Sequence, residues 1–319
     1  MACEGERVTT GRARWIYIAG QGRSGSTLLG MLAARAAGGF HCGELYRLPE
    51  ALVAGHLCQC GAEVPRCAVW ATVARRVRAL TGLPSDRACL EVMRDRLRRR
   101  HLLAPVMPPA RAGELALRRA TERAIEDVTG SAVVVDSSKL ASQLWTAAHL
   151  CRQLTVVHLV RDPRGVAFSQ SRPLYDPAWR AEWAPRPPWQ TALAWVRGQV
   201  TTERVVRQLR ARAIISADVT LRYEDLVSDP ASALERVTGT SLGDLAPTPA
   251  AVHEQHAIYG NPMRFDPGAI VPDERWRRAM GVAARSVVTA ITAPLLGRYG
   301  YPLAPGRPVQ RAAEPTAGT

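Results

Sequence analysis

The chain has 319 residues, of which 47% are hydrophobic and 22% charged, and its formal net charge is +14. These values are typical of a globular protein that forms one large α/β domain or two small ones. No apolar run is long enough to span a membrane, and the first fifteen residues lack the apolar core of a signal peptide, so we expect a cytoplasmic protein. Seven cysteines without a secretion signal indicate mostly reduced thiols.

A large positive charge is compatible with nucleic acid, a membrane or small anions as partners. The sequence contains no recognisable nucleic-acid-binding module, and the arginine-rich run 94–100 is typical of a solvated helix face. We therefore expect no nucleic-acid partner and no membrane partner. Among 42 basic residues there is a single lysine, Lys139, an imbalance that suggests a GC-rich genome. A lone lysine is a candidate functional residue, although it can also be a lysine that escaped the bias.

The first predicted strand, Trp15–Ala19, runs into a glycine-rich loop at residues 20–27, which is followed by an apolar helix. This order of strand, loop and helix is the one that phosphate-binding loops require. The alternative is an ordinary Gly/Ser-rich turn between a strand and a helix.

The spacing inside the loop is that of G-x-x-x-x-G-K-[ST] with one change. Gly20, Gly25 and Thr27 occupy the matching positions, whereas Ser26 replaces the lysine. Because that lysine contacts the β- and γ-phosphates, the loop predicts a ligand with fewer phosphoryl groups. Arg23 can still bind one anionic group through two N–H donors.

The stretch Phe40–Pro49, FHCGELYRLP, follows the first helix and places Glu44 near the predicted loop. We expect Arg47 to keep this carboxylate ionised, while partial burial raises its pKa. The alternative is that Glu44 caps the next helix.

A cluster of cysteines follows, in which His56, Cys58, Cys60 and Cys67 have the spacing H-x-C-x-C-x6-C. This spacing differs from a standard zinc finger. A zinc site, a disulfide from Cys58 or Cys60 to Cys67, and packed free thiols all stay open.

Helical periodicity over residues 70–129 predicts two or three helices, which we interpret as an insertion over the sheet. The next strand, Ala132–Val135, is followed by Asp136, Ser137, Ser138 and Lys139.

A further strand, Thr155–Val160, ends at Arg161, the usual ligand edge of an open α/β sheet. Asp162 can cap the following helix and Pro163 fits its first position, with Ser169 two turns along. The alternative is a capped helix that carries a surface arginine.

Residues 172–189 are rich in Pro, Trp and Arg and predict an irregular loop. Its aromatic residues, together with one in the next helix, can form a wall for a flat or amphipathic ligand or simply pack the loop. They are Tyr175, Trp179, Trp183, Trp189 and Trp195.

The last strand candidate, Val219–Tyr223, is followed by Glu224-Asp225-Leu226, and Tyr223 belongs to the motif RYEDL. Further on, a stretch from His256 to Arg264 contains the turn Gly260-Asn261-Pro262 and precedes a D-x-x-W motif at Asp273. A surface turn is the alternative interpretation of this stretch.

Short apolar strands alternating with helices predict an α/β fold with a mostly parallel central sheet. We expect one domain over residues 1–302 with the helical insertion at about 70–129, and a disordered tail at 303–319.

These motifs together resemble PAPS-dependent sulfotransferases of bacterial type, including tyrosylprotein and carbohydrate sulfotransferases; PAPS is 3′-phosphoadenosine 5′-phosphosulfate. The resemblance covers about residues 15–280 and rests on the glycine-rich loop, the stretch around Glu44, the pair Arg161 and Ser169, and RYEDL. It implies a P-loop-like three-layer sandwich, PAPS as co-substrate and no required metal.

The resemblance also implies roles for individual residues. Glu44 would be the catalytic base, and Lys139 with Arg23 would stabilise the bridging and sulfuryl oxygens. Arg161 and Ser169 would bind the 3′-phosphate, Tyr223 would lie near the adenine, and Asn261 would order a closing loop. The remaining cofactor contacts would come from Gly22, Ser24, Gly25, Ser26, Thr27, Ser137 and Arg264.

The expected acceptor is a hydroxyl of a small molecule, such as a secondary metabolite or glycan. The chain departs from the phenol and steroid branch, because Ala141 stands where that branch has a catalytic histidine. Two alternatives are a P-loop kinase with Asp136 as the Mg²⁺ ligand and a basic protein that binds nucleotides or RNA. The sequence does not indicate an oligomeric state.

Overall fold

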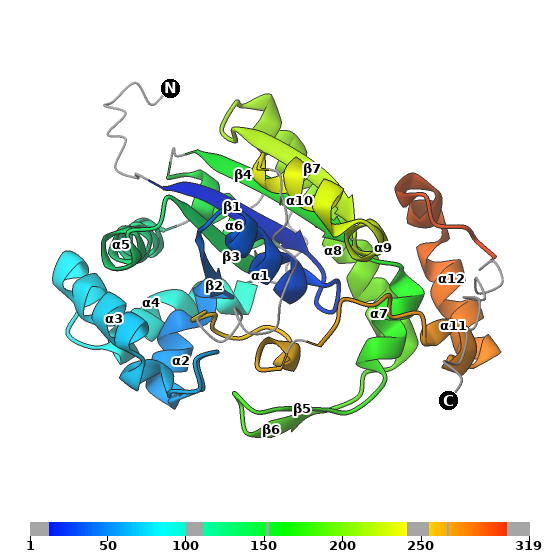
Figure 1. Ribbon diagram of the computed structural model, residues 1–319, viewed down its shortest axis with the longest axis horizontal. Coiled ribbons are helices and arrows are strands. Elements are labelled where there is room, and N and C mark those ends of the chain that lie inside the picture. Colours follow the sequence, from blue (N-terminus) through cyan, green and yellow to red (C-terminus); the bar gives the residue numbers. More distant parts are fainter. Residues whose placement is uncertain (1–12, 100–110, 151–152, 241–254, 267, 305–319) are drawn as a thin grey trace, which may run out of the picture.

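A five-stranded parallel sheet forms the centre of the molecule, with helices on both of its faces (Figure 1). The computed structural model describes residues 13–99, 111–150, 153–240, 255–266 and 268–304. In spatial order the strands are β2 (Phe40–Gly43), β3 (Val133–Lys139), β1 (Arg14–Gly20), β4 (Leu154–Val160) and β7 (Ala217–Arg222).

All four strands predicted from the sequence are present, and the sheet contains one more. The short edge strand β2 was not predicted, because only four residues of mixed polarity form it. Strand β3 is longer than expected, since its polar end pairs with β1 and places Lys139 opposite Ala19. The last strand ends at Arg222, so that Tyr223 begins a helix.

The two faces of the sheet are buried by two different sets of helices. On β1, Trp15 and Tyr17 point to one face, and Ile16 and Ile18 point to the other, as alternation in a strand requires. The first face packs on α5 (Ala112–Thr129), α6 (Ala141–Ala148) and α8 (Pro188–Ala211). The second packs on α1 (Ser26–Ala36), α9 (Tyr223–Ser228) and α10 (Pro230–Thr238). The predicted three-layer α/β sandwich is confirmed.

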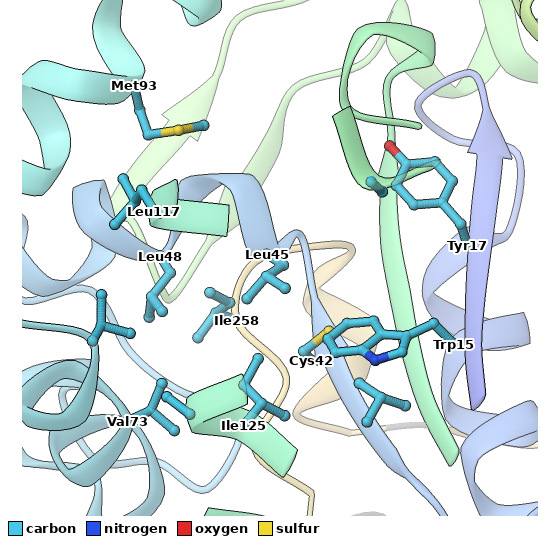
Figure 2. Packing of buried hydrophobic residues seen from close by; sticks show 14 of the residues in the cluster. Trp15, Tyr17, Cys42, Leu45, Leu48, Val73, Met93, Leu117, Ile125 and Ile258 are labelled. Carbon is cyan, nitrogen blue, oxygen red and sulfur yellow. The ribbon is translucent and has the colours of Figure 1, made fainter. Parts of the chain in front are cut away.

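The predicted helical insertion contains three helices, α3 (Ala68–Thr81), α4 (Asp86–Arg99) and α5. With α2 (Leu48–Ala54), helices α3 and α4 gather beyond the β2 edge of the sheet (Figure 1). Figure 2 shows how Val73, Leu117 and Ile125 from this region pack near Ile258 from the C-terminal part of the chain. Residues 100–110, between α4 and α5, lie outside the described residues, as do the side chains of the run 94–100.

On the opposite side of the molecule, α7 (Pro163–Gln170) and α8 pack against α12 (Val282–Leu296), with α11 (Trp276–Ala279) beside α7. Residues 172–189 are not wholly irregular, which corrects the prediction. They contain an antiparallel hairpin of β5 (Leu174–Asp176) and β6 (Ala181–Trp183) that stands apart from the main sheet (Figure 1).

Short 3₁₀ turns complete the described structure at Leu45–Arg47, Val64–Arg66, Pro262–Arg264 and Gly297–Tyr299. The tail predicted at 303–319 lies outside the described residues beyond position 304. No helix in the described part of the chain combines the length and the apolar character needed to cross a bilayer.

Candidate active site

The residues singled out at strand ends all lie at the carboxyl edge of the sheet. The loop at 20–27 follows β1, Glu44 follows β2, Lys139 ends β3, Arg161 follows β4, and Tyr223 follows β7. Strand β1 is central, with β3 on one side and β4 on the other. Open α/β sheets bind ligands at such a position, where successive connections leave toward opposite edges.

The glycine-rich loop is held in a conformation that only glycine fits at two positions. A Cβ on Gly20 would lie 2.3 Å from the Leu159 carbonyl oxygen, and one on Gly25 would lie 2.5 Å from the Tyr223 ring. Gly25 also has φ +91°, a left-handed conformation that favours glycine. The Ser24 hydroxyl donates to the Gln21 carbonyl at 2.6 Å. Helix α1 begins directly after this turn, so its N-terminal N–H groups face the loop, as anion sites require.

The C-terminal segment lies directly on this loop. The Asn261 backbone N–H donates to the Thr27 hydroxyl at 2.8 Å, and a Cβ on Gly260 would lie 2.7 Å from the same oxygen. The Asn261 side chain accepts from the Met263 N–H at 3.0 Å and thereby orders the turn. The segment from His256 to Arg264 thus contacts the loop from a position more than 230 residues away in the chain.

Arg264 is completely buried beneath this turn. Its Nη1 donates to the Gly260 and Asn261 carbonyls, at 3.1 and 3.2 Å. Among the described residues its Nε and Nη2 have no hydrogen-bond partner, and the nearest counter-charge is the Asp176 carboxylate at 3.7 Å. Burial lowers the pKa of Arg264, and the charge of Asp176 partly offsets this effect. Buried N–H donors without a partner are costly, so they mark a position where an anion can bind.

Arg161 is held rigidly beside the loop. Its guanidinium lies 4.3 Å above the Tyr223 ring, donates to the Arg23 carbonyl at 3.0 Å, and pairs with Asp273 at 3.1 Å. Burial alone raises the pKa of Asp273, but hydrogen bonds from Arg275 and the charge of Arg161 lower it to about 2. The D-x-x-W motif that contains Asp273 predicts no partner for this carboxylate, so the pair with Arg161 is a finding of the structure.

Helix α7 begins as predicted. The Asp162 side chain accepts from the Arg164 N–H at 2.9 Å, and Pro163 occupies the first position. Arg164 also pairs with the same carboxylate at 2.7 Å, which fixes the helix start. Ser169 is half-buried two turns along the helix.

Glu44 and Lys139 form an ion pair at the ends of the neighbouring strands β2 and β3. Lys139 Nζ lies 2.6 Å from Glu44 Oε1 and 3.3 Å from the Ser137 carbonyl. Glu44 makes no capping hydrogen bond to the turn that follows, so the helix-cap alternative is wrong. The predicted partner is also corrected, because Arg47 pairs with Glu50 at 2.8 Å and Lys139 balances Glu44 instead.

Buried side chains near the Glu44–Lys139 pair form hydrogen bonds and an ion pair with one another. The Ser137 hydroxyl, expected to bind phosphate, lies 3.0 Å from His41 Nε2. Burial lowers the pKa of His41 to about 3, and the charges of Lys139 and Arg264 contribute. Asp136 pairs with the buried Arg118 at 2.6 Å and accepts from the Ser138 N–H at 2.9 Å. This carboxylate is therefore part of the interior.

The five aromatic residues expected to form one wall do not lie together. Trp195 is fully buried and donates to the Arg161 carbonyl at 3.1 Å, so it belongs to the core. Trp179 packs instead against His56 and Tyr259, with the Arg47 guanidinium 4.2 Å above its ring. Three further aromatic side chains are exposed: Tyr175 at 58%, Trp183 at 43% and Trp189 at 49%. The Arg23 guanidinium lies 5.9 Å from the Trp183 ring and links this hairpin to the loop.

The cysteine cluster has a different histidine from the one expected. His56 Nδ1 lies 2.5 Å from the Tyr259 hydroxyl, whereas Cys67 Sγ lies 3.3 Å from His256 Nδ1. Cys58, Cys60 and Cys67 are free thiols, so neither predicted disulfide is present in this structure.

Comparisons with known proteins give a family and a similar fold for this chain. A comparison with curated proteins found no significant match. Among solved structures, the chain resembles a sulfotransferase domain from the curacin biosynthetic pathway. The two sequences are 17% identical, the alignment covers 91% of this chain and 99% of that domain, and the TM-score is 0.52. It also resembles the sulfotransferase domain of the Synechococcus PCC 7002 olefin synthase, with 21% identity, 92% and 96% covered, and a TM-score of 0.48.

The family model described as "Sulfotransferase family" matches residues 16–240, which include the glycine-rich loop, the Glu44–Lys139 pair and the strand end at Arg161. The chain therefore belongs to the sulfotransferase family.

Proposed function

We propose that this protein transfers the sulfuryl group of PAPS to a hydroxyl of a small molecule, giving a sulfate ester and adenosine 3′,5′-bisphosphate. The observation that carries the proposal is the Glu44–Lys139 pair, 2.6 Å apart at the carboxyl edge of the sheet that also bears the glycine-rich loop. Sulfuryl transfer needs three things from a protein: positioning, charge neutralisation and removal of the acceptor proton.

The donor would bind across the loop. Gly22 to Thr27 and the start of α1 offer N–H groups and the Arg23 guanidinium to the 5′-phosphosulfate. Arg161, fixed by Asp273 and Tyr223, and Ser169 would bind the 3′-phosphate. The adenine would lie next to Tyr223, whose ring supports Gly25.

The closing segment offers further contacts to the donor. Nε and Nη2 of Arg264, which have no hydrogen-bond partner among the described residues, would donate to an anionic oxygen, and Asn261 keeps the turn above Thr27 in place. Ser137 is the weakest candidate of the predicted set, because its hydroxyl is already bonded to His41.

The transfer step follows from the chemistry of the pair. Glu44 would accept the proton of the acceptor hydroxyl as the oxygen attacks sulfur. The Lys139 ammonium has three N–H donors. Among the described residues, two of them are directed to Glu44 Oε1 and to the Ser137 carbonyl. The third is left for the bridging oxygen, whose negative charge grows as the S–O bond breaks. Arg23 would neutralise the sulfuryl oxygens.

The kinase alternative has no support from the site. Asp136, its Mg²⁺ ligand, is fully buried and paired with Arg118 and Ser138. The loop also lacks the lysine that contacts the β- and γ-phosphates.

The acceptor would bind between the loop and the hairpin. Trp183 is exposed there, with the Arg23 guanidinium 5.9 Å from its ring. An exposed aromatic face suits a flat or amphipathic small molecule.

Calorimetry and mass spectrometry test the proposal together. Adenosine 3′,5′-bisphosphate should bind tightly without Mg²⁺, and incubation with PAPS and a panel of hydroxyl compounds should give products heavier by one SO₃ group. ATP binding that depends on Mg²⁺, with no sulfated product, would contradict the proposal and favour the kinase. Binding of RNA with a steep salt dependence and no nucleotide preference would favour a nucleic-acid-binding protein.

A further inference from the structure

A cluster of three thiols and one imidazole lies beside the active site without a role in the proposed transfer. Its members are Cys58, Cys60, Cys67 and His256, and their sulfur and nitrogen atoms all lie within 4.8 Å of one another. We propose that these four side chains bind one zinc ion as a structural site. This inference goes beyond the proposed function, since it depends on neither the sulfuryl donor nor the acceptor.

Three of the ligand–ligand distances are close to those of a tetrahedral site, and all of them are within 4.8 Å. Zinc bonds sulfur at about 2.3 Å and imidazole nitrogen at about 2.0–2.1 Å, so neighbouring ligands lie about 3.8 Å apart for two sulfurs and about 3.5 Å for sulfur and nitrogen. Cys60 and Cys67 Sγ lie 3.8 Å apart. His256 Nδ1 lies 3.3 Å from Cys67 Sγ and 3.8 Å from Cys58 Sγ. A disulfide would need a sulfur–sulfur distance of about 2.05 Å.

Backbone hydrogen bonds hold the chain around the cluster in a fixed conformation. Gly61 follows Cys60 with φ +86°, and its N–H donates to the Cys58 carbonyl at 2.9 Å, which closes a tight turn. Cys67 directly precedes α3, and its N–H donates to the Glu63 carbonyl at 2.8 Å. Cys58 and Cys67 are buried while Cys60 is exposed, so a metal can enter from solvent.

The protein supplies all four ligands, so no coordination position remains for water or substrate. The zinc would therefore hold structure and take no part in the transfer. It would join the turn at 58–67 to the C-terminal segment, which also receives hydrogen bonds from Trp70 and Gln59: Trp70 Nε1 donates to the His256 carbonyl at 2.5 Å, and the Gln59 N–H donates to Ala257 at 3.1 Å.

That segment continues into the active site. Two residues after His256, the Ile258 carbonyl accepts from the Glu44 N–H at 2.9 Å, and three residues further on Asn261 contacts Thr27. A zinc ion at the cluster would thus fix the segment that positions both the proposed base and the glycine-rich loop.

Metal analysis of the full chain, purified under reducing conditions, tests the site directly. We expect about one zinc ion per chain by elemental mass spectrometry. Replacement by Co²⁺ should give the visible absorption of a tetrahedral ion and a near-ultraviolet sulfur-to-cobalt band. A protein that holds no zinc as purified, and binds neither zinc nor cobalt when one equivalent is supplied, would overturn the proposal.

Matched variants assign the ligands. Cys60→Ser alters an exposed side chain, so the fold should persist, and chelator treatment should lower its zinc from about one ion per chain to near zero. Cys89→Ser alters a free thiol on α4 outside the cluster and should keep the zinc. If the two variants retain the same amount of zinc, the cluster is not a metal site. The same conclusion follows if Cys60 and Cys67 form a disulfide in protein purified under reducing conditions.

Discussion

The strand-end region and the hairpin region of the candidate active site are built in different ways. The strand-end region comprises the loop at 20–27 with Glu44, Lys139 and Arg161, and each of its parts ends or directly follows a strand of one sheet. The hairpin region comprises β5, β6 and the aromatic side chains around Trp179, which belong to connecting segments.

The two regions also differ in burial and contacts. Arg161 is 7% exposed and Glu44 8%, and each has a charged partner within 3.1 Å. Trp183 is 43% exposed. The proposed donor contacts and the proposed catalytic pair thus lie on a buried and ion-paired edge of the sheet, while the proposed acceptor contacts lie on a separate and more exposed element. Substitutions in the first region should change kcat or donor affinity, and those in the second should change acceptor KM.

The largest expected effect concerns Glu44. Glu44→Gln keeps the shape of the side chain but cannot accept a proton, so kcat with an aliphatic alcohol should fall about 10²–10⁴-fold. Binding of adenosine 3′,5′-bisphosphate should stay unchanged in calorimetry. A phenol of low pKa should be affected less, because part of it is already ionised. Glu50→Gln, which alters the carboxylate paired with Arg47, is the control and should retain most activity; equal losses in both variants would remove Glu44 as the base.

Lys139 should rank second. Lys139→Ala should lower kcat about 10²–10³-fold with little change in PAPS affinity, because charge on the bridging oxygen grows mainly in the transition state. Lys139→Arg should restore activity only in part, since a planar guanidinium replaces a compact ammonium. A fully active Arg variant would mean that the lone lysine reflects composition alone.

The double variant of Glu44→Gln and Lys139→Ala separates two roles of the lysine. If Lys139 acts on the leaving oxygen, the two losses in kcat should multiply. If it only orients Glu44 through the 2.6 Å contact, the double variant should be no worse than Glu44→Gln.

Arg161 should affect donor binding. Arg161→Ala removes a charge-assisted contact to the 3′-phosphate, so affinity for adenosine 3′,5′-bisphosphate should fall about 10- to 100-fold. ATP, which lacks that phosphate, should be affected little in the same calorimetric titration. Arg204→Ala, an exposed arginine on α8, serves as the control. Equal losses for both nucleotides would place Arg161 outside the 3′-phosphate site.

A smaller effect is expected in the hairpin region. Trp183→Ala should raise the acceptor KM about 3- to 10-fold while kcat and donor affinity stay near wild type, because an exposed aromatic contact contributes about 1 kcal/mol. Trp189→Ala, with 49% exposure against 43%, is the matched control. If the two variants show the same KM in steady-state kinetics, Trp183 does not contact the acceptor.

The smallest effect at neutral pH concerns His41. Its pKa is about 3 in the folded protein and about 6.5 in the unfolded chain, so the unfolded chain binds a proton more readily below pH 6.5. The free energy of unfolding should therefore fall as the pH drops from about 6.5 toward about 3, by up to about 1.4 kcal/mol per pH unit.

Urea unfolding at about pH 7 and about pH 5 measures this effect. The difference between the two pH values should shrink by about 2 kcal/mol in His41→Gln and stay unchanged in His149→Gln. An unchanged difference in both variants would show that His41 does not control the acid sensitivity.

Much of the strand-end region was predictable from the sequence. The alternation of apolar strands and helices indicated a parallel sheet, and the motifs at the strand ends followed from it. Asp162 as a cap and Asn261 as the residue that orders its turn were also predictable, because each acts through hydrogen bonds to its own chain neighbours. Such local contacts depend on a few adjacent residues, which the sequence displays directly.

Only the tertiary structure decided which residues far apart in the chain interact with one another. Glu44 pairs with Lys139 and not with Arg47. Arg161 is fixed by Asp273. The histidine next to the cysteines is His256 and not His56. Asp176 beneath Arg264 had no signal in the sequence at all. The sequence by itself determined which residues sit at strand ends, since local pattern sets the strands. It could not determine which charges meet there, because that depends on how segments about a hundred residues apart pack in three dimensions.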